Sequence, residues 1–182
     1  MPFPIEHRYS AEEFFALDIP DNDRYELIEG ELVLLAAPSE IHQELAGGIY
    51  AELRDFIRRS RGSCKPFIAP FDVKLDDDNV VQPDIMVICD PSKLDGKRCN
   101  GAPDIVIEVT SNDRTRDYSI KLELYRKSGV SEYWIVDPEK KRVVVYTFED
   151  RKVDSMDIYT FDNDIPVGIY GGALRLNINA LL

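Results

Sequence analysis

The chain has 182 residues, of which 44% are hydrophobic and 31% charged, and its formal net charge is −12 at pH 7. This length fits one domain, residues 1–182, and the balanced composition excludes a disordered or fibrous chain. The charge argues against a broad basic surface for nucleic acid, because nonspecific affinity comes mainly from lysines and arginines that neutralise phosphates.

Neither a membrane-spanning segment nor a disulfide framework is expected. No apolar run reaches the roughly 18 to 20 residues of a membrane span, and the start lacks the basic-then-apolar order of a signal peptide. We therefore expect a cytoplasmic protein with no membrane partner. Cys64, Cys89 and Cys99 are odd in number and contain no CxxC pair, so we expect reduced thiols and neither a disulfide framework nor a zinc site.

The first third of the chain predicts two helices around a hairpin. Ser10 and Glu13 form a capping-box pattern ahead of a short amphipathic helix. The stretch 24–35 alternates apolar and polar residues, which predicts a hairpin or a bulged strand pair. Ser39 can cap a longer helix over 39–59 that covers one face of a sheet, because apolar residues recur at spacings of three and four.

Strands dominate the rest of the chain. We expect strands over 67–75 and 80–89, followed by a run over 104–109 whose β-branched residues predict a strand buried on both faces at the centre of the sheet. A third helix is predicted over about 114–128. Further strands are predicted over 132–136, 143–148 and near 158–161. Together these elements predict an α/β (α+β) fold with a central mixed sheet flanked by helices.

Two carboxylates interrupt strands that otherwise favour burial. Asp84 follows Pro83 at the start of an apolar run, and Glu108 lies within the predicted central strand. An unpaired buried carboxylate costs several kcal/mol, so such a residue is paired, exposed at a strand end, or bound to a metal. These two residues alone leave ion pairs and a metal site equally open.

Lys121 favours the metal site. At about 100° per residue, it lies near the middle of an apolar arc of the third helix, so its amine is expected to point toward the sheet. There are two alternatives. The Lys121 side chain could extend along the helix so that its amine reaches solvent at the edge of the arc, or the amine could form an i,i+4 ion pair with Asp117. The apolar arc contains Tyr118, Ile120, Leu122, Leu124 and Tyr125.

Two carboxylates and a lysine around one pocket suit the hydrolysis of a phosphodiester. Mg²⁺ prefers oxygen ligands and keeps several waters, so Asp84 and Glu108 would share its shell with a main-chain carbonyl and a substrate phosphate. The metal would polarise the phosphoryl oxygen and lower the pKa of a bound water. The ammonium of Lys121 would steady the attacking hydroxide or the developing charge.

Several sequence blocks occur in a familiar order. Residues 81–84, the strand that ends at 108–109, and residues 117–121 resemble the core of the PD-(D/E)XK nucleases. A further set resembles the Uma-type restriction endonucleases: 25–32, 38–39 with His42, 101–104 and 129–138. The resemblance implies a restriction-endonuclease-like fold and a nuclease that cleaves DNA with Mg²⁺, for which Mn²⁺ is a possible substitute.

The chain departs from the family pattern at two points. The third motif position, two residues after Glu108, is Thr110 and not lysine. Similar proteins supply the lysine from the following helix, which maps onto Lys121. Residues 111–113 read Ser-Asn-Asp where relatives usually read Ser-Pro-Ser, and this difference leaves substrate access beside the site open.

Further residues are candidates for the site. Some members of the superfamily place an acid from the N-terminal elements near the metal, which would make Glu26 a catalytic residue; the alternative is a surface-facing strand residue. His42 and Asp117 are candidate substrate contacts. His42 would contact a phosphate or act as a base, or it would serve only the cap of its helix.

Three functions remain open. The leading hypothesis is a Mg²⁺-dependent DNA endonuclease that uses Asp84, Glu108 and Lys121. An interaction or regulatory protein that keeps the scaffold without the chemistry is favoured by the acidic charge. A metal-dependent hydrolase of a smaller phosphoester, such as a nucleotide, would tolerate that charge more easily.

We expect a homodimer, because cutting both strands of a duplex takes two sites and a twofold dimer matches the dyad of DNA. Apolar residues of the last segment exceed what a loose tail needs and would form a contact; alternatively, they complete the monomer core. These residues are Ile165, Val167, Ile169, Tyr170, Leu174, Leu176 and Ile178. The basic residues Arg54, Arg58, Arg59 and Arg61 of two copies would line one cleft, or would only complement a helix C-terminus.

Overall fold

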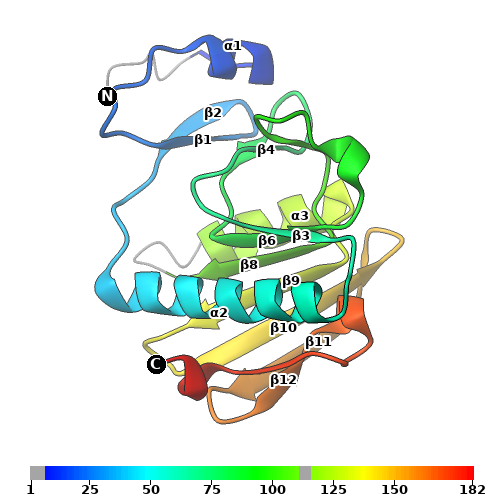
Figure 1. The fold of residues 1–182 in the computed structure, drawn as a ribbon. Coiled ribbons are helices and arrows are strands. Elements are labelled where there is room, and N and C mark those ends of the chain that lie inside the picture. Colours follow the sequence, from blue (N-terminus) through cyan, green and yellow to red (C-terminus); the bar gives the residue numbers. More distant parts are fainter. Residues whose placement is uncertain (1–6, 111–115) are drawn as a thin grey trace.

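A large sheet and a small sheet form the framework of the protein, shown in Figure 1. The computed structural model describes residues 7–110 and 116–182, and in the second range side chains from 119 onward. The large sheet contains, in spatial order, β11 (Lys152–Thr160), β10 (Arg142–Glu149), β9 (Glu132–Asp137), β8 (Ile105–Val109), β6 (Ile85–Ile88) and β3 (Lys65–Ile68). The small sheet contains β2 (Glu31–Leu34), β1 (Tyr25–Ile28), β5 (Val80–Val81), β4 (Val73–Lys74) and β7 (Cys99–Asn100).

Helices and a C-terminal hairpin complete the fold. The helices are α1 (Ala11–Ala16), α2 (Glu40–Arg59), a π-helix (Arg116–Lys121) and α3 (Leu122–Ser128). Short 3₁₀ turns cover Pro91–Lys93, Gly168–Tyr170 and Ile178–Leu181, and the hairpin pairs β12 (Asp164–Pro166) with β13 (Arg175–Asn177). Within the described residues no helix has the length and apolar character needed to cross a membrane.

Strand β8 lies inside the large sheet, as predicted. It runs antiparallel to β6 and parallel to β9, which makes the sheet mixed, and all of its residues are buried. Alternation along β8 directs Ile105 and Ile107 to the face covered by α2, and Val106 to the face covered by α3. Figure 1 shows the two helices on opposite faces of the sheet. The predicted central mixed sheet flanked by helices is confirmed.

The N-terminal elements build the small sheet. Ser10 and Glu13 form the predicted capping box of α1. Strands β1 and β2 form the predicted hairpin, and both residues of its turn have positive φ, 51° at Glu29 and 78° at Gly30. Glycine and short hairpin turns accept this conformation readily. The hairpin carries Glu26 on β1.

Two predicted strands are divided between the sheets. The segment 67–75 leaves the large sheet after β3 and enters the small sheet as β4, and 80–89 runs from β5 in the small sheet to β6 in the large one. Each break contains a proline, Pro70 or Pro83, which has no N–H to donate to a ladder. The second crossover places Asp84 at the junction of the two sheets.

The third helix begins as a π-helix in its described part and becomes α-helical only at Leu122. The wider π turn changes the angle between successive side chains, so the predicted apolar arc is wrong at one position. Ile120 is 45% exposed, whereas Lys121 is 5% exposed. Such π turns occur often at functional sites.

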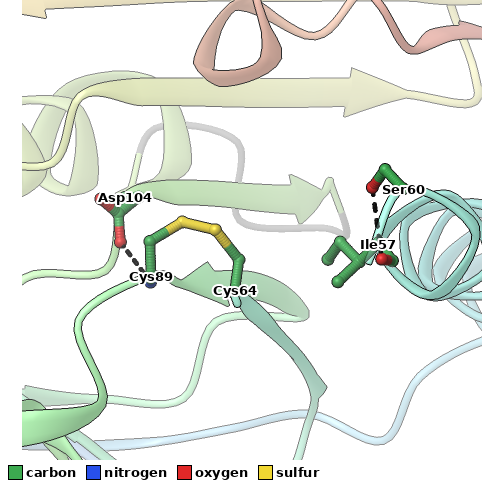
Figure 2. The surroundings of a disulfide bond; sticks show 5 residues. All are labelled: Ile57, Ser60, Cys64, Cys89 and Asp104. Carbon is green, nitrogen blue, oxygen red and sulfur yellow. Dashed lines mark hydrogen bonds between the residues drawn. A yellow bond between two sulfur atoms is a disulfide. The ribbon is translucent and has the colours of Figure 1, made fainter. Parts of the chain in front are cut away.

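The expectation of three reduced cysteines is wrong for two of them. Cys64 and Cys89 form a disulfide, and only Cys99 is free and buried. The ladder that pairs Lys65 with Ile88 leaves the two cysteines directly opposite one another, with their Cα atoms 3.9 Å apart (Figure 2). Because they lie 25 residues apart in the chain, spacing alone could not reveal the register that joins them.

The C-terminal segment completes the monomer core. Its residues Ile165, Val167, Leu174, Leu176 and Ile178 are buried in the same cluster as the inner face of α2. Ile169 and Tyr170 pack against that cluster. The apolar surplus that suggested a dimer contact is therefore used within one chain, in agreement with the alternative interpretation.

Candidate active site

A cavity of about 260 Å³ lies where the small sheet, the start of α2 and the end of the π-helix meet the large sheet. Its lining includes all but one of the residues proposed from sequence: Glu26, His42, Asp84, Glu108 and Lys121. The side chain of the remaining candidate, Asp117, lies outside the described residues. The loop over 111–113 lies outside them as well. Residues from five separate segments thus converge on one cavity.

Lys121 lies between two buried glutamates. Its Nζ is 2.8 Å from Oε1 of Glu108 and 3.0 Å from Oε1 of Glu26. Glu26 is 0% exposed, so its interpretation as a surface-facing strand residue is wrong. Removing one partner from such a buried ion group leaves an uncompensated charge, which costs several kcal/mol.

Tyr125 is a site residue that the sequence reasoning missed. Its hydroxyl donates to Oε1 of Glu108 at 2.7 Å, and the side chain is fully buried. Burial raises the pKa of Tyr125 well above its ordinary value, and the charges of Glu108 and Glu26 raise it further. The phenol therefore remains a hydrogen-bond donor. Its position one helical turn after Lys121, on the same face, was the available signal.

Asp84 occupies the more exposed side of the cavity. Its Oδ2 accepts the backbone N–H of Val109 at 2.8 Å and lies 3.0 Å from Nε2 of His42. The side chains of Asp84 and His42 are 17% and 12% exposed. The backbone N–H of His42 also donates to the capping hydroxyl of Ser39, so this residue serves both its helix and the cavity.

Three buried polar atoms of the cavity have no hydrogen-bond partner among the described residues: Oε2 of Glu26, Nδ1 of His42 and Oε1 of Gln82. Sequence reasoning missed Gln82. Its Nε2 donates to Oδ1 of Asp72 at 2.9 Å, which assigns the amide orientation and leaves Oε1 as the unpartnered atom. Buried polar atoms without a partner are rare in native proteins, and their concentration here indicates a ligand or ordered water.

The oxygen atoms of this cavity fit Mg²⁺ better than a softer metal. Within the described ranges, no cluster of three or more His, Cys, Asp or Glu side chains could hold an ion by itself. Mg²⁺ does not require such a cluster, since it keeps several waters and uses one or two carboxylates. Asp84 and Glu108, which both line the cavity, are the two carboxylates that would hold the ion.

The basic stretch does not reach the cavity. Arg54, Arg58, Arg59 and Arg61 are exposed at the far end of α2. The 16 residues from His42 to Arg58 span about 24 Å along a helix. Arg58 also pairs with Asp55 at 3.1 Å. Within one chain, these residues are thus remote from the candidate site.

Comparisons with known proteins agree with this architecture. The crystal structure titled "a putative nuclease belonging to DUF820 from Anabaena variabilis ATCC 29413" superposes with a TM-score of 0.76. It is 23% identical, and the alignment covers 94% of this chain and 96% of that one, which establishes a shared fold. A search of curated proteins found no match. The Uma2 family model, described as "Putative restriction endonuclease", matches residues 11–176, and the chain therefore belongs to the Uma2 family.

Proposed function

We propose that the protein is a Mg²⁺-dependent endonuclease that hydrolyses phosphodiester bonds in DNA. The observation that carries the proposal is the buried Lys121, held between Glu26 and Glu108 in the cavity that Asp84 also lines. Membership of a family described as restriction endonucleases supports the same reaction class.

Each residue has a role that follows from its position. Asp84 and Glu108 would hold Mg²⁺, which supplies Lewis-acid activation of the phosphoryl group and of water when bound. Glu26 would take part through Oε2, the oxygen that has no hydrogen-bond partner among the described residues. Lys121 would stabilise the charge that develops on the phosphate, because a fixed ammonium in a buried site is worth more than one in water.

Tyr125 and His42 act on the carboxylates. Tyr125 holds Oε1 of Glu108 with a donor that stays protonated. His42 contacts Asp84 and lies at the first turn of α2, where backbone N–H groups and the helix dipole favour an incoming anion. Together they would keep both carboxylates oriented before substrate arrives.

The test is a cleavage assay on supercoiled, linear and single-stranded DNA with Mg²⁺, Mn²⁺ or EDTA. We expect cleavage only with a divalent ion and a loss of about a hundredfold or more in Asp84→Asn. Asp157→Asn is the matched control, because Asp157 is an exposed acid on β11. Cleavage that persists in EDTA, or an Asp84→Asn variant as active as the control, would contradict the proposal.

A smaller phosphoester is the second candidate substrate. The formal charge of −12 and the distance from the cavity to the basic end of α2 favour it. Turnover of a small phosphodiester in Mg²⁺, without cleavage of any DNA form, would select this alternative. An inactive protein that still bound the ion would instead select a regulatory role.

We further propose that the endonuclease acts as a homodimer, since a double-strand cut takes two sites. The C-terminal apolar residues no longer support this proposal, because they lie in the monomer core. Light scattering at several concentrations tests it. A mass that stays near 20.8 kDa at all concentrations would exclude the dimer. A mass near twice that value that persists on dilution would support it.

A further inference from the structure

Arg24 lies beside the carboxylates of the cavity, on the same strand face as Glu26. It precedes β1, and its carbonyl accepts the N–H of Leu35, which continues the ladder of the hairpin. Alternation directs Tyr25 and Leu27 into the core under α1, and Arg24 and Glu26 toward the cavity. Two residues along a strand span about 7 Å, a distance that an arginine side chain can bridge.

The guanidinium of Arg24 has no hydrogen bond or ion pair within the described residues, although its side chain is half-buried. Some other arginines of this acidic chain are paired with an acid, such as Arg126 with Glu123. Asp72 lines an adjacent crevice together with Arg24, but its Oδ1 accepts Nε2 of Gln82. The guanidinium of Arg24, which lines the same cavity as the carboxylates of Glu26, Asp84 and Glu108, is therefore available to a ligand.

We propose that Arg24 binds a phosphate of the nucleic-acid substrate adjacent to the one that is cleaved. This inference rests on the proposed nuclease function. A guanidinium offers donors in a planar fork that matches two phosphate oxygens, and Arg24 lines the cavity with the other cation, Lys121, bound to Glu26 and Glu108. Arg24 thus supplies positive charge at the site, where the basic end of α2 does not reach.

The proposal predicts a change in the salt dependence of binding. The dissociation constants of a fluorescent duplex and a single strand would be measured in Ca²⁺ at several salt concentrations. For Arg24→Met we expect about tenfold weaker binding at moderate salt. The slope of log affinity against log salt should become shallower by about 0.9 on the duplex and 0.7 on the single strand.

Two further variants separate phosphate binding from general charge and from structure. Arg24→Lys should retain the salt slope and lose part of the affinity, because it keeps the charge but not the fork. Lys97→Met removes the same charge from an exposed position that does not line the cavity, and it should leave the slope unchanged. Melting temperatures of the variants verify that the fold is intact.

The outcomes distinguish this proposal from the proposed function. An Arg24→Met variant with the wild-type slope, in a protein that cleaves DNA with Mg²⁺, would overturn the role of Arg24 alone. A shallower slope in a protein that binds without cleaving would support Arg24 and overturn the nuclease. A protein that binds neither nucleic acid would overturn both.

Discussion

The two ends of the large sheet each bury a glutamate, and the partners of the two residues differ. Glu108 near the end of β8 is 4% exposed, and Glu132 at the start of the neighbouring β9 is 1% exposed. In sequence they are alike, since each is an acid within a strong strand pattern. Their surroundings assign them opposite roles.

Glu132 is satisfied by neutral donors. Its carboxylate accepts Nε1 of Trp134 at 2.6 Å and the backbone N–H groups of Gly168 and Ile169 at 3.0 and 2.8 Å. These contacts attach the C-terminal segment to the sheet. At the same end, Asp104 accepts the N–H of Cys89 beside the disulfide, as Figure 2 shows. The contacts at the Glu132 end of the sheet thus join segments of the chain to one another and stabilise the fold.

Glu108 is held by a cation and a phenol, beside a cavity that contains unpartnered polar atoms. A carboxylate whose charge is balanced by a lysine can exchange that contact for a metal ion, which leaves the lysine available to a phosphate, whereas the backbone donors of Glu132 are fixed in the chain. The two buried acids therefore differ in their partners and not in their burial, since Glu132 contacts neutral donors and Glu108 contacts a cation.

The largest effect is expected at the site end. Lys121→Met should lower the free energy of unfolding by about 3 to 5 kcal/mol, because it leaves two buried carboxylates without their cation. Adding Glu26→Gln should recover part of this loss. Lys127→Met is the control, since Lys127 is 65% exposed and its ion pair with Glu123 is worth at most about 1 kcal/mol. Equal urea midpoints for the two lysine variants would refute the buried ion group.

The disulfide should give the next largest effect, at the opposite end. Replacing Cys64 and Cys89 together by alanine should cost about 3 kcal/mol, because the bond closes a loop of 25 residues in the unfolded chain. Cleavage should be unchanged, since neither cysteine lines the cavity. Urea unfolding with and without reductant measures the effect. Identical midpoints under both conditions would show that the bond contributes nothing.

Glu132→Gln should cost about 2 kcal/mol, because an amide cannot accept all three donors. Burial raises the pKa of Glu132 above 4.5, so the folded state binds more protons than the unfolded state just above that pH. The contribution of Glu132 therefore falls as pH rises from about 4.5 to its folded pKa. Unfolding measured across this range should show the decline in the wild type and not in Glu132→Gln. A contribution that increased with pH would contradict the assignment.

Tyr125→Phe should have the smallest effect, about 1 kcal/mol, because Oε1 of Glu108 keeps its contact with Lys121. The substitution should affect Mg²⁺ binding more than stability, since Glu108 loses one of the donors that orient its carboxylate. Titration with Mg²⁺ would detect weaker binding at nearly unchanged stability. Tyr133→Phe, a neighbouring buried tyrosine in ring contact with Tyr125, provides a comparison.

Local patterns predicted most elements and singled out the carboxylates that line the cavity. The capping box of Ser10, the alternation around Glu29 and the β-branched run of β8 are local signals, and the structure contains each. Lys121 is buried, as its place on the apolar helical face predicted, even though the neighbouring Ile120 is exposed at the π turn.

Long-range pairing could not be predicted in the same way. The bond between Cys64 and Cys89 depends on the register of β3 against β6, and no local pattern encodes that register. Gln82 was missed because its role depends on Asp72, a contact set by the crossover between the sheets. The alternation that points Arg24 to the side of Glu26 was visible in the sequence, but its importance depends on the cavity.

The most direct test of the proposed metal site is to measure Mn²⁺ binding by calorimetry in the wild type, Asp84→Asn and Glu132→Gln. We predict saturable binding to the wild type and to Glu132→Gln with similar affinity. In Asp84→Asn the affinity should fall by about tenfold or more, because a carboxylate at the mouth of the cavity is lost. Equal affinity in wild type and Asp84→Asn, or no saturable binding to the wild type, would contradict the assignment of this end of the sheet as a metal-dependent active site.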